Sequence, residues 1–84
     1  MNEKISQALE DIARAAKSTG DDSKIKQAIT AAKNLVSGQA SLQQLESELS
    51  TWQSKLSVIL KEPVGRQGLA KHAGYWAEKL RADS

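Results

Sequence analysis

A ladder of large apolar residues between positions 42 and 60 constrains the fold of this chain more than any other feature. Its members follow one another at alternating spacings of three and four residues: Leu42, Leu45, Leu49, Trp52, Leu56 and Ile59. Such a ladder forms when one stripe of a helix packs against neighbouring helices. The sequence therefore predicts a long helix over 41–62, with Ser41 and Gln44 as a capping box. Pro63 should end it, because proline disfavours helical geometry in the preceding residue.

Two shorter amphipathic helices are expected before this one, over about 3–18 and 23–37. Their apolar residues recur at helical spacing and are mostly Ala and Ile. The first face carries Ile5, Ala8, Leu9, Ile12, Ala13 and Ala16, and the second carries Ile25, Ala28, Ile29, Ala32, Leu35 and Val36. Gly20 and Gly38 follow them and suit the left-handed position beyond a helix C-terminus. Glu10 and Arg14 are spaced to pair along the first helix.

A fourth helix over about 66–82 should follow a Pro/Gly turn at 62–65. Its inner face carries Leu69, Ala73, Trp76, Ala77 and Leu80. The connections are short, so neighbouring helices should run antiparallel. We predict an all-α fold, a small antiparallel up-down bundle of four segments that makes one domain over 1–84. Alternatively, the last two segments form the main hairpin, and the Ala-rich first two pack loosely or against a second chain.

The chain offers few means of stabilising a small core. It has 84 residues, no Cys and no Phe, and His72 is its one histidine, so neither a disulfide nor a Cys/His metal site is expected. A chain of this length buries only roughly 60 to 65% of its unfolded surface. We therefore expect self-association or a protein partner to add to the core.

Catalytic chemistry has little support in the sequence. A nucleophile needs a base beside it, and His72 is the only imidazole, while the carboxylates are scattered over helix faces. We predict no catalytic residue, no metal and no cofactor. The expected function is that of a small non-enzymatic interaction module, which docks by a helix face, as a homo-oligomer or with a partner protein.

The most distinctive stretch is 62–76, which concentrates glycine, proline and aromatic residues. The candidate binding surface comprises Arg66, Lys71, His72, Tyr75 and Trp76. Its first three members could bind an anion at a helix N-terminus, and the aromatic residues could supply contact area. Gly65 and Gly68 would let a ligand or partner approach closely, and Gly74 a neighbouring backbone. The alternative is that the stretch is only a turn followed by a bundle helix.

The charge distribution leaves a second function open. The net charge is +2, but residues 55–81 carry +4 and the rest −2. An anion or nucleic-acid binding protein that uses the basic start of the fourth helix is the alternative function. No apolar run is long enough to cross a bilayer, and the N-terminus does not resemble a signal peptide. We therefore expect a cytoplasmic protein that does not enter membranes.

Overall fold

The computed structural model describes residues 2–18 and 21–83, and these residues form an all-α fold, as predicted. No strand occurs in this part of the chain. The helices are α1 (Asn2–Lys17), α2 (Asp22–Val36), the short 3-10 helix η1 (Ala40–Leu42), α3 (Gln43–Ser54), α4 (Leu56–Ile59) and α5 (Pro63–Asp83). Gly38 has a φ of 84°, which confirms the left-handed residue expected after the second helix. Gly20 lies outside the described residues.

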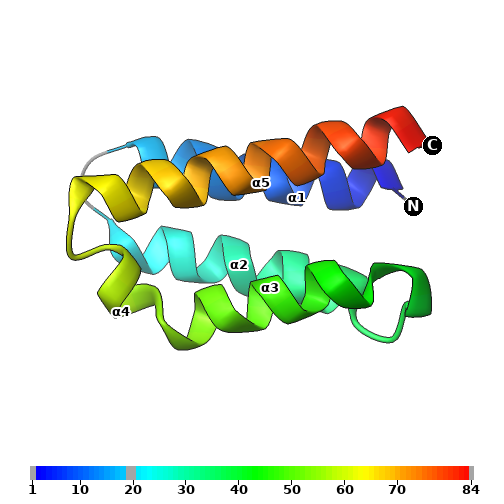
Figure 1. The fold of residues 1–84 in the computed structure, drawn as a ribbon, viewed down its shortest axis with the longest axis horizontal. Helices are drawn as coiled ribbons and strands as arrows, with labels where there is room; N and C mark the ends of the chain where they lie inside the picture. The colour runs from blue at the N-terminus through cyan, green and yellow to red at the C-terminus, as the bar shows by residue number, and fades with distance from the viewer. Residues whose placement is uncertain (1, 19–20, 84) are drawn as a thin grey trace.

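The helices form two antiparallel layers (Figure 1). One layer pairs α1 with α5, the other pairs α2 with α3, and α4 links the layers at one end. The first and last described residues lie side by side at the opposite end. The molecule measures 33 × 21 × 17 Å. Because a helix of the length of α5 spans about 32 Å, α5 runs along the whole molecule.

One apolar core joins all four long helices. It contains the predicted faces: Ile5, Leu9, Ile12, Ile25, Ile29, Val36, Leu42, Leu45, Leu49, Trp52, Leu56, Leu69, Ala73, Trp76 and Leu80. The large apolar side chains of α1 and α2 are fully buried against their own chain, except Leu35, which the pattern placed on the inner face but which is 37% exposed. The alternative in which the first two helices pack loosely or against a second chain is therefore wrong.

The third segment is not the single helix predicted over 41–62. Its regular hydrogen bonding stops at Lys55, which has φ −109° and ψ 16°, and resumes in the single turn of α4. Serine and threonine around this point compete with the helix, and the hydroxyl of Thr51 donates to the carbonyl of Ser47 at 3.1 Å. The break keeps Leu56 in the core while the chain turns towards α5. The Ser41–Gln44 capping box is also wrong, since Leu42 occupies the N-cap position and no side chain caps the helix there.

The last helix begins three residues earlier than predicted. Pro63 is its first residue, where the missing N–H costs nothing and the fixed φ suits a helix. This early start places Gly65 against α4, and a Cβ built at Gly65 would lie only 1.9 Å from the carbonyl oxygen of Ile59. The glycine therefore accommodates this chain's own backbone, whereas the sequence predicted that a ligand or a partner would approach there.

Candidate functional site

Two of the five sequence candidates serve the fold. Trp76 is 7% exposed, belongs to the core, and donates from Nε1 to Oε2 of Glu48 at 3.0 Å. This bond ties α5 to α3 and satisfies the one polar atom of the ring. Arg66 reaches to the start of α2, where its Nη2 lies 2.6 Å from Oδ1 of Asp22. Both side chains thus have partners within the bundle.

The basic candidates do not converge on one point. Lys71 and His72 are both exposed, but Lys71 borders a groove with α1, whereas His72 borders a smaller groove with Trp52 and Ile59. Because the helix starts at Pro63, both residues lie in its third turn. The dipole of a helix acts mainly within its first turn. The arrangement expected of an anion site at the helix N-terminus is therefore absent among these residues.

Tyr75 is an exposed aromatic candidate. It retains 58% of its accessible surface, an unusual value for a large aromatic residue. One edge of the ring meets Trp76 in a T-shaped contact, with centroids 6.0 Å apart and planes at 76°. The Lys79 ammonium lies 5.9 Å from the Tyr75 centroid and 5.0 Å from that of Trp76. These contacts hold the ring in place and leave much of it available to a partner.

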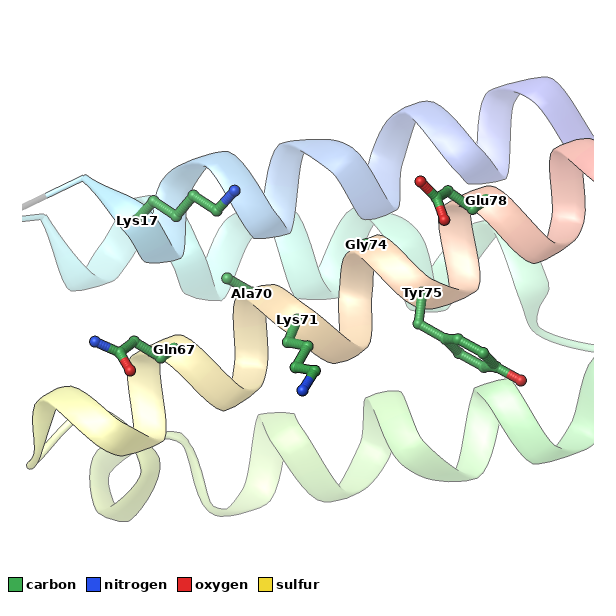
Figure 2. Close-up of a pocket in the computed structure, with 7 residues that line it drawn as sticks. All are labelled: Lys17, Gln67, Ala70, Lys71, Gly74, Tyr75 and Glu78. Carbon is green, nitrogen blue, oxygen red and sulfur yellow. The ribbon is translucent and has the colours of Figure 1, made fainter.

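A groove of about 560 Å³ runs between α1 and α5 beside Tyr75 (Figure 2). It is lined by Lys17, Gln67, Ala70, Lys71, Gly74, Tyr75 and Glu78. A second groove, of about 420 Å³, shares Lys17, Gly74 and Glu78 and continues towards Ala77. A Cβ built at Gly74 would meet nothing within 4 Å. The close backbone approach predicted at Gly74 is therefore not made within the described chain, and the glycine leaves an open notch.

The outward face of α5 forms a continuous stripe opposite its core face. We call it the α5 stripe, and its residues are Val64, Gln67, Lys71, Gly74, Tyr75, Glu78 and Ala82. Among residues 2–18 and 21–83, Val64 and Tyr75 are two of the four large apolar residues that are exposed, the others being Leu35 on α2 and Val58 on α4. Val64 and Glu78 were not among the candidates predicted from the sequence. Each lies seven residues from Lys71, and residues seven apart share one face of a helix, so this spacing could have placed both on the face away from Leu69 and Trp76.

The charges of α5 divide into paired and unpaired groups. Arg81 forms ion pairs with Glu10 and with Glu3, the second at 3.3 Å, and Arg66 pairs with Asp22. The hydrogen bonds from Arg81 hold the pKa of the Glu10 carboxyl below its ordinary value and raise the pKa of the guanidinium. The predicted Glu10–Arg14 pair is wrong, since Arg14 lies 3.1 Å from Asp11.

Lys71 and Glu78 differ from these residues. Neither forms an ion pair with any other side chain in 2–18 and 21–83. Both are exposed, and they stand one on each side of Gly74 and Tyr75 on the α5 stripe. The stripe therefore presents one positive and one negative charge to whatever lies outside the bundle.

No cluster of three or more His, Cys, Asp or Glu side chains that could hold a metal ion occurs in the described part of the chain. Within the same residues, no helix is both long and apolar enough to span a membrane. No protein-family model, curated protein or solved structure matches the chain.

Proposed function

We propose that this protein is a non-enzymatic interaction module that binds another helical surface through the α5 stripe. The observation that carries the proposal is Tyr75, which is 58% exposed and yet held by Trp76 and Lys79. An aromatic side chain whose rotamer is already restricted loses little entropy when a partner covers it. Tyrosine is also among the residues that contribute most to binding energy at protein interfaces.

The surroundings of Tyr75 fit a helix as the partner. Val64 lies three turns away on the same face and is 75% exposed, so apolar contact is offered along much of the stripe. The notch at Gly74 allows a second backbone to come close. Lys71 and Glu78 would fix the position and direction of a partner by opposite charges.

The alternative of anion or nucleic-acid binding has weaker support. Phosphate binding at a helix start needs cations gathered around free N–H groups. Here Arg66 is paired with Asp22, and Lys71 and His72 border different grooves. We place the proposed interaction in the cytoplasm, which the lack of cysteine favours.

Photo-crosslinking tests the proposal. Benzoylphenylalanine is introduced in place of Tyr75 or, as the control, in place of Val58, which is 70% exposed but lies on α4. After irradiation in cells, we expect a discrete protein adduct at position 75 and none at 58. The adduct should disappear when Lys71 and Glu78 are both changed to Ser. No adduct at position 75, or one that survives the double change, would overturn the proposal.

A further inference from the structure

The α5 stripe has a symmetry that identifies its partner more closely. Lys71 and Glu78 lie at equal distances along the helix from the midpoint between Gly74 and Tyr75. Gln67 and Ala82 are likewise equidistant from that midpoint. Reversing the direction of the helix therefore exchanges the positive position with the negative one, and the glycine with the tyrosine.

From this pattern we propose that the partner is a second copy of the chain, docked with its α5 antiparallel to the first. The inference rests on the proposed function, because it uses the same surface. In a two-fold dimer one patch meets itself, so each contact occurs twice. Lys71 of each copy then faces Glu78 of the other, and both unpaired charges of the stripe gain a partner.

Gly74 and Tyr75 give this pairing its centre. In the antiparallel register, the Tyr75 ring of one copy lies beside Gly74 of the other and fills the open notch. Without side chains at the two glycines, the helix axes can approach to the lower end of the usual range of about 8 to 10 Å. The Tyr75 ring contributes buried area, and Gly74 leaves room for this ring because it has no side chain.

Charge supports the antiparallel arrangement of two copies over a parallel one. A parallel copy would place Lys71 against Lys71 and Glu78 against Glu78, which like-charge repulsion disfavours. The antiparallel register alone makes both pairs attractive. The other cations of α5 do not interfere, since Arg66 and Arg81 pair within the bundle and Lys79 lies over Trp76.

Sedimentation equilibrium of the purified chain, up to about 1 mM, tests the inference with charge variants. We expect a reversible monomer–dimer equilibrium. Lys71→Glu or Glu78→Lys alone should weaken dimerisation on the order of tenfold, since two symmetric pairs become repulsive at once. The combined variant should return to within about threefold of the original, because each pair is restored with reversed signs. Lys55→Glu makes the same charge change away from the stripe and should have no effect.

Two glycine variants test the close approach independently. Gly74→Ala should weaken dimerisation on the order of tenfold, because its methyl groups lie where the helices cross. Gly68→Ala is the matched control: a Cβ there also meets nothing within 4 Å, but Gly68 borders the groove with Trp52 and Ile59, whereas Gly74 borders the groove with α1. Gly68→Ala should leave dimerisation unchanged. Both variants should keep the helix content, which circular dichroism verifies.

The outcomes separate this inference from the proposed function. A purified chain that remains monomeric at all concentrations overturns the inference, and so do charge reversals without effect. If position 75 nevertheless crosslinks to a different protein in cells, the interaction module stands and only the second copy is refuted. If position 75 gives no adduct of any kind, both proposals fail.

Discussion

Substitution of Gly65 by alanine should destabilise the fold, although the same change elsewhere in α5 should stabilise it. A Cβ at this position would lie 1.9 Å from the carbonyl oxygen of Ile59 and 2.9 Å from its carbonyl carbon. Real Cβ atoms essentially never come within 3.0 Å of such an atom, so α4 and α5 must separate by more than 1 Å. Both contacts are to backbone, so no side-chain rotation can relieve them.

The size of the effect follows from what α4 holds in place. Leu56 is 8% exposed, and Ile59 and Leu60 pack against the core, so moving α4 disturbs well-packed apolar contacts. Overpacking of this kind costs about 1 to 3 kcal/mol, whereas exchanging Gly for Ala in a helix gains about 1 kcal/mol. We expect a net loss of up to about 2 kcal/mol for Gly65→Ala.

The other glycines of α5 supply the control. At Gly68 and Gly74 a Cβ meets nothing within 4 Å, so alanine should raise the stability of the monomer by about 1 kcal/mol at each position. Denaturant unfolding at low protein concentration measures all three, with self-association suppressed by dilution. Equal or greater stability of Gly65→Ala than of Gly68→Ala would refute the contact between α4 and α5.

Two further perturbations test the core and the charge pairs. Leu49 is fully buried, so Leu49→Ala should cost about 2 to 5 kcal/mol in denaturant unfolding, whereas Lys55→Ala on the exposed side should be nearly neutral; similar losses would contradict the assignment of faces. Arg81 lowers the pKa of Glu10, and Ser23 lowers that of Asp21, so both carboxylates add stability at neutral pH. Thermal melts should show this stability falling as the pH drops below about 4, and an unchanged melting temperature between pH 7 and pH 3 would contradict it.

The apolar pattern predicted which residues face the core, and the structure confirms most of them, whereas Leu35 on α2 was predicted to face inward and is 37% exposed. The ladder from Leu42 to Leu56 is buried, and so are Ile5, Leu9 and Ile12. This success has a physical reason, since apolar residues at helical spacing share one face of the helix and that face packs against the core. The break at Lys55 escaped prediction because the spacing continues through it. A ladder shows which side of a segment is buried, but not whether its backbone hydrogen bonds are continuous.

The start of α5 and the partners of the candidate site residues could not be predicted from local sequence spacing. Proline can follow the end of one helix, and it can equally be the first residue of the next. Pro63 was therefore compatible with both positions, and in the structure it begins α5. Arg66 and Trp76 looked available in the sequence, but their partners Asp22 and Glu48 lie far away along the chain. Local spacing could identify exposed Lys71 and Tyr75, whereas it could not show which polar groups the fold pairs internally.

A dilution series followed by amide NMR spectra tests the central claim, that the protein binds through the α5 stripe. As the concentration rises, we expect the resonances of Lys71, Gly74, Tyr75 and Glu78 to shift together along one binding curve. Those of Val58 on α4 should stay fixed. Concentration-dependent shifts centred on Val58, or none within the stripe, would contradict the account.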